Sequence, residues 1–113
     1  MEFDSANLPG NIVQLSLNGR LDMQGTETIN VKFTYLTTVN PGKFIVDLSQ
    51  VSFLASIGIR MLLTCARAQS SRGGKMVLAA PQPAVRKVIE AAGVDQLVPV
   101  LADIETAKAS LGE

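Results

Sequence analysis

The chain has 113 residues, with ten acidic and ten basic side chains and a formal net charge of zero. This length fits one domain with a sizeable core, so we expect a single domain over residues 1–113. A balanced charge without basic clusters excludes the electrostatic footprint of a nucleic-acid or membrane-surface binder. Histidine is absent, which removes the commonest general base and metal ligand and favours an interaction module over an enzyme.

The sequence shows neither an apolar run of transmembrane length nor a signal-peptide pattern. We therefore expect a soluble cytoplasmic protein without direct membrane insertion. The single cysteine, Cys65, excludes an internal disulfide and falls in a predicted apolar helix, where it should act as a small hydrophobic residue. One cysteine without histidine disfavours a zinc site, and we predict neither a metal nor a cofactor.

Two strands are predicted at the start of the chain. Residues 1–10 form a short strand that ends in a Pro-Gly turn. Residues 11–17 alternate apolar and polar side chains, as a strand with one buried face does. Asn18-Gly19 then favours a bend or a bulge.

A helix follows these strands. Asp22 is suited to cap a helix that begins near Met23. Its apolar face repeats at i, i+4 and i+7, at Ile29, Phe33 and Leu36. The segment is rich in threonine and has poor helix propensity, so packing must hold it in place. Residues 40–42, Asn-Pro-Gly, end it as a turn.

A change from strand-like to helix-like spacing marks the middle of the chain. Residues 44–48 form a short buried strand, residues 49–55 form a polar connection, and Ser56 opens a helix at its N-cap position. The apolar face of this helix consists of Ile59, Leu62, Leu63 and Ala66. Together these features predict one βα unit.

The remaining segments continue the alternation. They are a strand at residues 75–80, a helix from Pro83 to Gly93, an edge strand at residues 97–101 and a helix capped by Asp103. The order β-β-α-β-α-β-α-β-α predicts an α/β fold with a mostly parallel sheet of about five strands flanked by helices.

Carboxylates and glycines offer two alternative chemistries. Asp22 and Asp47 both lie near the carboxyl ends of predicted strands, where a pair could bind a metal. A helix cap at Asp22 and backbone hydrogen bonds at Asp47 explain them more simply. Gly73-Gly74 precedes a strand rather than a helix, which indicates a turn and not a phosphate loop. The missing phosphate loop and the missing histidine count against a nucleotide-binding or hydrolytic enzyme.

Ser56 is the candidate functional residue. Its simplest role is the N-cap, worth about 1 kcal/mol. Its functional role would be phosphorylation, because the helix dipole tolerates a phosphate there while a partner pressed on the same helix does not. Gly58 leaves a low surface for a partner or for the protein's own sheet. Ile57 and Met61 either contact a partner or widen the core face, and Arg60 faces solvent, where it can meet an acidic partner.

The run from Val46 to Ile59 resembles the STAS domain family, the bacterial anti-sigma factor antagonists. The family motif at this place begins with Asp-Leu-Ser-x-Val-x-Phe. It continues with one apolar residue, then Asp-Ser, then Ser or Thr, then Gly, and it ends with Leu or Ile. Residues 19–22 match its Gly-x-apolar-Asp at the start of the first helix. Later glycines match at Arg72–Lys75 and Ala92–Val94, so the resemblance covers nearly the whole chain. Two positions depart from the pattern: Ala55 replaces the Asp, and Ile57 replaces the second hydroxyl residue.

This resemblance implies a non-enzymatic regulator that acts by partner switching. An unphosphorylated antagonist binds an anti-sigma factor that is also a serine kinase, which frees a sigma factor. Phosphorylation lowers the affinity, and a serine phosphatase resets the system. Carried over, the phosphorylated serine is Ser56, and Asp22 is the acidic residue beside it. The predicted partner surface comprises Asp22, Met23, Ser52, Leu54, Ala55, Ile57, Gly58, Arg60 and Met61.

One alternative within the family stays open. The chain could be a constitutive STAS scaffold subunit of a stressosome-like or lipid-transport complex, with Ser56 acting only as a cap. Ala55 bears on this choice, since its Asp counterpart could orient the serine hydroxyl or bind the kinase. In either role we expect a monomer or a weak dimer.

Overall fold

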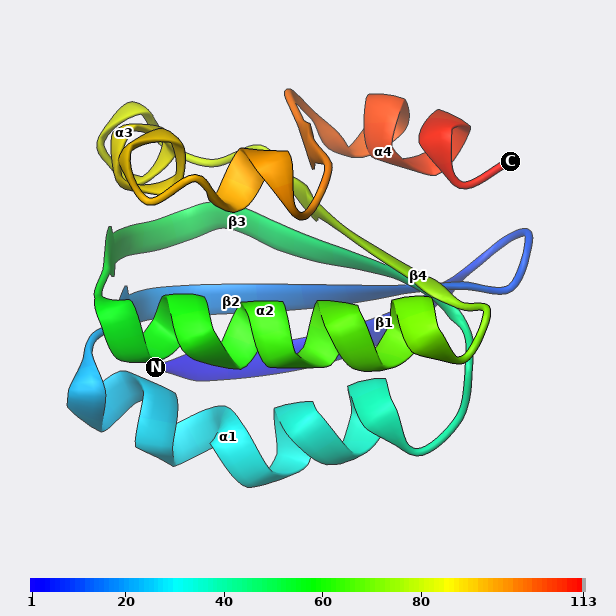
Figure 1. Cartoon of the computed structure of the whole chain (residues 1–113), viewed down its shortest axis with the longest axis horizontal. Helices are drawn as coiled ribbons and strands as arrows, with labels where there is room; N and C mark the ends of the chain where they lie inside the picture. The colour runs from blue at the N-terminus through cyan, green and yellow to red at the C-terminus, as the bar shows by residue number, and fades with distance from the viewer. Residues whose placement is uncertain (113) are drawn as a thin grey trace.

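The computed structural model describes residues 1–112, and its elements follow the predicted order (Figure 1). The strands are β1 (Glu2–Leu8), β2 (Ile12–Leu21), β3 (Lys43–Leu54), β4 (Lys75–Ala79) and β5 (Val100–Leu101). The helices are α1 (Met23–Thr38), α2 (Ser56–Ser71), α3 (Pro83–Ala91) and α4 (Ile104–Ser110), with the short 3₁₀ helix η1 (Val94–Gln96) between α3 and β5. Within the described residues, no helix has both the length and the apolar character needed to span a bilayer.

One five-stranded sheet, in the order β1-β2-β3-β4-β5, forms the middle layer. β1 pairs antiparallel with β2, and every other neighbouring pair is parallel. The predicted Pro-Gly turn joins β1 to β2, with positive φ angles of 86° at Gly10 and 60° at Asn11. The predicted fold class, an α/β domain with a mostly parallel sheet, is therefore confirmed.

Helices cover both faces of the sheet. α1 and α2 lie side by side along one face, and α4 packs on the other (Figure 1). The larger core contains Phe33 and Cys65, and the smaller one contains Ile45 and Ala107. Ile45 and Val46 are neighbours in β3 but belong to different cores, because successive side chains of a strand point to opposite faces. Cys65 is fully buried, as predicted.

β3 is longer than the sequence predicts. It continues through most of the predicted connection, residues 49–55, and ends at Leu54. The end of β2 pairs with this part, so that Val51 lies opposite Gly19 and Leu54 opposite Leu21. Val51 and Leu54 are also buried in the larger core. The predicted connection is wrong because pairing with β2 and the burial of Val51 and Leu54 outweigh the polar side chains around them.

Two other strands also end elsewhere than predicted. β2 does not stop at Leu17 but passes through the predicted bulge, where Gly19 has a φ of 124°, and reaches Leu21. The predicted strand at residues 97–101 shrinks to Val100–Leu101. Its first residues instead close the turn of η1, since the Val98 N–H donates to the Val94 carbonyl.

The caps predicted for the first and last helices are confirmed. The Asp22 carboxylate accepts a hydrogen bond from the Gly25 N–H at 2.8 Å, and Asp103 accepts one from the Thr106 N–H at 2.7 Å. Gly93 follows α3 in a left-handed conformation with a φ of 73°, as expected for a glycine past a helix end. Of these caps, Asp22 sets the start of α1 next to the candidate site.

Candidate functional site

The structure brings Asp22 and Ser56 to one edge of the sheet. Leu21 and Leu54 lie opposite each other at the ends of β2 and β3. The Ala55 N–H donates to the Leu21 carbonyl at 2.9 Å, which ties the two strand ends together. The residues that follow begin α1 and α2 at neighbouring positions. In open α/β sheets, the carboxyl ends of the strands are where binding sites form.

Ser56 is not the N-cap of α2. That position belongs to Ala55, which has extended φ and ψ angles of −98° and 169°, and Ser56 is the first helical residue. No side chain caps the helix, and its first turn carries no acidic residue. Ser56 is exposed. The predicted cap role is therefore wrong, and the helix start offers backbone N–H groups that no side chain uses.

Asp22 holds a negative charge beside this helix start. A hydrogen bond from the Gly25 N–H, assisted by Arg20, lowers the pKa of Asp22 against the opposing effect of burial. The Arg20 Nε lies 3.3 Å from Asp22 Oδ2. Its Cζ also lies 4.3 Å from the centroid of the Phe53 ring, a cation–π contact. Arg20 thus links the carboxylate that caps α1 to an aromatic ring of β3.

Arg20 and Phe53 were not among the residues singled out from the sequence. They lie opposite each other in β2 and β3, so aligning these two strands in the sequence would have brought them together. That alignment requires knowing that β3 extends to Leu54, and the polar residues between 49 and 55 instead suggest that the strand ends earlier. Phe53 is 41% exposed, unlike its buried neighbour Leu54.

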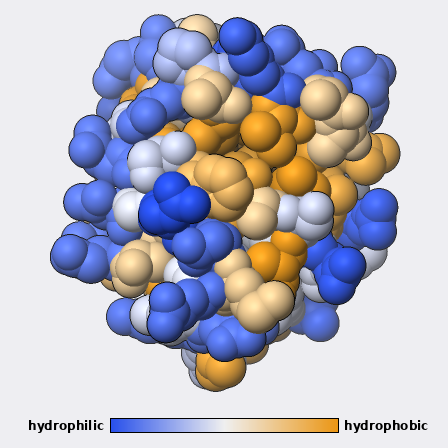
Figure 2. Space-filling view, turned by 90° about the vertical axis from the view of Figure 1, so that its left-hand side faces the viewer, coloured by the Kyte–Doolittle hydropathy of each residue, from blue (hydrophilic) through white to orange (hydrophobic). Residues whose placement is uncertain are grey.

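The end of the molecule that carries these residues has a broad hydrophobic area framed by polar residues (Figure 2). Two of the exposed large hydrophobic residues belong to elements that begin or end there. Met23, the first residue of α1, is 66% exposed, and Phe53 lies one residue before the end of β3. An exposed apolar area with a polar rim is typical of a protein interaction site.

The other predicted contact residues differ in exposure. Ser52 and Arg60 are exposed, and Ile57 is half-buried. Leu54 is only 3% exposed, so its side chain belongs to the core and the prediction that it contacts a partner is wrong. Met61 is 6% exposed and packs in the larger core. Of the two roles considered for it, it therefore widens the core face.

Gly58 packs the first turn of α2 closely on the strand ends. A Cβ atom at this position would lie 3.1 Å from Leu21 Cβ, from the Leu21 carbonyl oxygen and from Leu54 Cδ1. Of the two roles considered for Gly58, the tight approach to the protein's own sheet is the one seen. It places the start of α2, and hence Ser56, directly against the ends of β2 and β3.

Asp47 does not join this site. The register places it opposite Ser16, about 20 Å along the strands from Asp22 at the usual rise of about 3.3 Å per residue. It instead accepts a hydrogen bond from the Ser49 N–H at 2.9 Å. Residues 1–112 contain no group of three or more His, Cys, Asp or Glu side chains placed to hold a metal ion. The paired-carboxylate alternative therefore loses its geometric basis.

Known proteins share this fold. A family model described as "Mlab, STAS domain" matches residues 5–99. An anti-sigma factor antagonist from Mycobacterium paratuberculosis has a TM-score of 0.88 at 21% identity, covering 99% of this chain and 94% of its own. An anti-sigma-factor antagonist (STAS) domain protein from Planctomyces limnophilus has a TM-score of 0.86 at 18% identity, covering 98% of both chains.

A third solved structure is the phosphorylated form of the Bacillus cell fate determinant SpoIIAA. Its TM-score is 0.67 at 25% identity, and the match covers 96% of this chain and 98% of that chain. At such low identities, structural similarity shows only the fold. The family model matches most of the sequence and therefore shows the family. The chain belongs to the STAS domain family, and its fold is that of the anti-sigma factor antagonists.

Proposed function

We propose that this protein is an anti-sigma factor antagonist that acts by partner switching in the cytoplasm. Unphosphorylated, it binds an anti-sigma factor with serine kinase activity through the ends of β2 and β3 and the starts of α1 and α2. Phosphorylation of Ser56 releases this partner, and a serine phosphatase restores binding. The protein is the substrate of these enzymes and has no catalytic group of its own.

The observation that carries this proposal is the exposed Ser56 hydroxyl at an uncapped helix start. A phosphate there would carry close to two negative charges and would meet free backbone N–H groups at the positive end of the helix dipole. The domain itself therefore tolerates the modification. SpoIIAA, a protein of this fold, has been solved in both its unphosphorylated and its phosphorylated form.

The surroundings of Ser56 explain why a partner would not tolerate the phosphate. The surface offers apolar contacts at Met23 and Phe53 next to the ionised Asp22. A partner that buries this apolar area would have to desolvate the new charges near a carboxylate of the same sign. Burial of unpaired charge is strongly unfavourable, so phosphorylation weakens the complex while leaving the fold intact.

Capture and phosphorylation test this proposal. Immobilised unmodified protein should retain the kinase from a lysate of the source organism. The purified kinase with ATP and Mg²⁺ should then modify Ser56, as mapped by mass spectrometry of the digested protein. Ser56→Ala should stay unmodified, and Ser5→Ala, which alters an exposed serine of β1 outside the predicted partner surface, should be modified as the wild type is. Phosphate at another residue, or none, would count against the switch.

A constitutive scaffold is the second candidate, and Ala55 favours it. The family's acidic residue before the serine is missing, and the nearby Asp22 carboxylate is already engaged by Gly25 and Arg20. If this role is correct, the same capture experiment returns structural subunits of a larger complex and no kinase. Ser56→Asp would then leave the captured set unchanged.

A further inference from the structure

β1 is a long and exposed strand at one border of the sheet. It pairs with β2 over seven residues without a register shift, and five of these residues are exposed. The strand at the opposite border, β5, has only two residues and follows Pro99. Because β1 contains neither a proline nor a β-bulge, the backbone N–H and C=O groups on its outer side form a regular row that another strand can pair with.

The sequence of β1 suits antiparallel pairing with a second copy of itself. When two copies overlap over the whole strand, they meet at the middle residue, Ser5. Glu2 of one copy then lies opposite Leu8 of the other. Asp4 lies opposite Ala6, so that no carboxylate faces another one. A shift that brings the two Asp4 side chains opposite each other would be unfavourable, because like charges directly across a strand pair destabilise it. The longest overlap therefore also keeps the acidic side chains apart.

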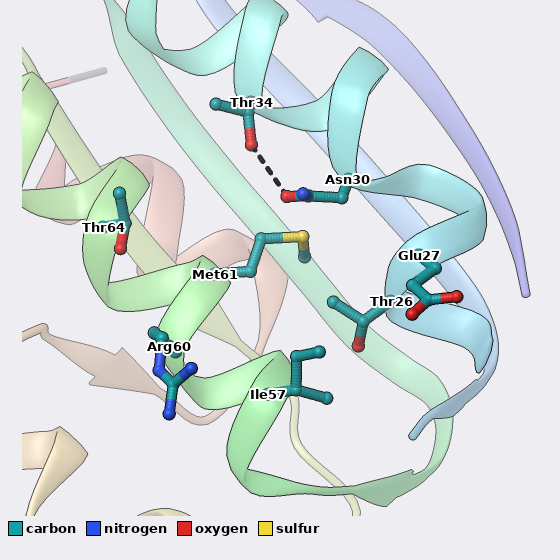
Figure 3. Close-up of a pocket in the computed structure, with 8 residues that line it drawn as sticks. All are labelled: Thr26, Glu27, Asn30, Thr34, Ile57, Arg60, Met61 and Thr64. Carbon is teal, nitrogen blue, oxygen red and sulfur yellow. Dashed lines mark hydrogen bonds between the residues drawn. The ribbon is translucent and has the colours of Figure 1, made fainter. Parts of the chain in front are cut away.

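α1 leaves one of its flanks uncovered above β1. Thr34 lines the groove between α1 and α2, which marks the flank that faces α2 (Figure 3). On the other flank, Lys32 Nζ lies 5.5 Å from the centroid of the Phe3 ring of β1. Leu36 and Val39 follow Lys32 at i+4 and i+7 and therefore share its flank. Leu36 is half-buried and Val39 is 43% exposed, so this flank offers apolar surface next to the free strand.

We propose that two copies of this chain form a symmetric dimer in which β1 pairs antiparallel with β1. A two-fold axis normal to the sheet joins the two sheets into one and keeps both copies of α1 on the same face. α1 lies over β1 and β2, with Phe33 packed on Phe3, about one strand spacing from the junction. The two copies of α1 thus come about 10 Å apart, the usual distance of packed helices.

The helix flanks and the strand edges then form one continuous interface. Leu36 and Val39 of each copy become covered by the α1 helix of the other, while the backbone groups of β1 gain about one ladder hydrogen bond per residue. The two-fold axis places the two Ser56 surfaces at opposite ends of the dimer and leaves both open. Dimerisation therefore stands apart from the proposed switch.

Sedimentation velocity of the full chain over a range of concentrations tests this proposal. The interface is small, so we expect a monomer–dimer equilibrium with a Kd of about 1–100 µM. Ala6→Lys places an ammonium group opposite Asp4 of the second copy, twice in the dimer, and should tighten dimerisation about fivefold. Ala6→Glu places two carboxylates opposite each other and should weaken it by about the same factor.

The same substitutions at Ala102 are the matched controls. This exposed residue follows β5, at the opposite border of the sheet, so Ala102→Lys and Ala102→Glu should dimerise as the wild type does. A chain that stays monomeric throughout this range would overturn the proposal. Equal dimerisation of Ala6→Lys and Ala6→Glu would overturn it as well, because the interface would then lie elsewhere.

A cysteine at the two-fold axis tests the register of the two strands. Opposite residues of an antiparallel pair have Cα atoms about 4.5–5.5 Å apart, within the range of a disulfide. Ser5→Cys should therefore form a covalent dimer on mild oxidation, as seen on a non-reducing gel. Asn7→Cys is the control on the same face of β1, because its two copies would lie about 14 Å apart and should stay unlinked. The native Cys65 is buried. Cross-linking of both variants alike, or of Asn7→Cys alone, would contradict the pairing.

Discussion

A one-residue shift at the start of α2 decides what Ser56 can do. Because Ala55 takes the N-cap position, the Ser56 hydroxyl is not used by the helix and remains exposed. Sequence signals at a helix start do not separate the cap from the first helical residue, and this is why the prediction was off by one. This matters for function, because the Ser56 side chain is not needed to cap the helix and its hydroxyl is free for modification.

The uncapped start of α2 predicts a stabilising substitution. Ala55 already has the extended backbone of an N-cap, so Ala55→Ser or Ala55→Asp should raise the free energy of unfolding by about 1 kcal/mol. Urea denaturation measures this difference. Ala102→Ser, at an exposed loop residue before Asp103, places a serine outside a cap and should change little. A loss of stability in both Ala55 variants would contradict the cap geometry.

Asp22 predicts an acid-dependent contribution to stability. The hydrogen bond from Gly25 and the nearby Arg20 lower its pKa in the folded state. This contribution is therefore fully present above the unfolded pKa of about 3.9 and is lost as pH falls through the lower folded value. Asp22→Asn should lose stability at neutral pH and approach the wild type in acid, as followed by urea denaturation at several pH values. Asp4→Asn, on exposed β1, controls for loss of one charge. A constant difference across pH would contradict this account.

At the scale of the element, α2 is fixed at both ends. Gly58 seats its first turn on the strand ends, and Gln69 anchors its last turn. The Gln69 side chain is fully buried, accepts from the Gly42 N–H at 2.9 Å and donates to the Asn40 carbonyl at 2.9 Å and to the Thr37 carbonyl. It thus pairs backbone groups of the last turn of α1 and of the connection between α1 and β3.

Gln69→Leu should therefore destabilise the fold by roughly 2–4 kcal/mol, because it leaves buried backbone groups without partners. Chemical denaturation measures the loss. Gln96→Leu, at an exposed position of η1, is the matched control and should stay within about 0.5 kcal/mol of the wild type. Equal stability of the two variants would show that the Gln69 hydrogen bonds contribute little.

Local signals predicted the order of elements, whereas long-range pairing set their ends. The caps at Asp22 and Asp103 and the end of α3 at Gly93 depend on adjacent residues, and all three were predictable. The extension of β3 to Leu54 depends on pairing with β2, which is distant in sequence. Gln69 would be expected at the surface from its polarity, and only the packing of α2 against the α1–β3 connection gives it a partner.

At the scale of the whole molecule, the site rests on a continuous core that contains the single cysteine. Cys65 is fully buried between α2 and α1, and burial raises the pKa of its thiol. Both features suppress reaction with thiol reagents in the folded state. The thiol therefore reports opening of the domain that carries the Ser56 surface.

Labelling of Cys65 should be at least about a thousandfold slower in the folded protein than in urea, in line with a stability of about 5 kcal/mol or more. The rate should rise with urea in parallel with unfolding followed by circular dichroism. Ser56→Asp should label at about the wild-type rate, because the charge lies at an exposed helix start. Fast labelling of either folded protein would contradict the packing described for α2.

The most direct test of the central claim is the affinity of the captured anti-sigma factor kinase for the two states of Ser56. Isothermal titration calorimetry should compare unmodified protein with protein phosphorylated at Ser56 alone. The account predicts at least about tenfold weaker binding after phosphorylation, about 1.4 kcal/mol, with an unchanged free energy of unfolding or a small increase. Equal affinity, or tighter binding of the phosphorylated form, would contradict the proposal that Ser56 is the switch.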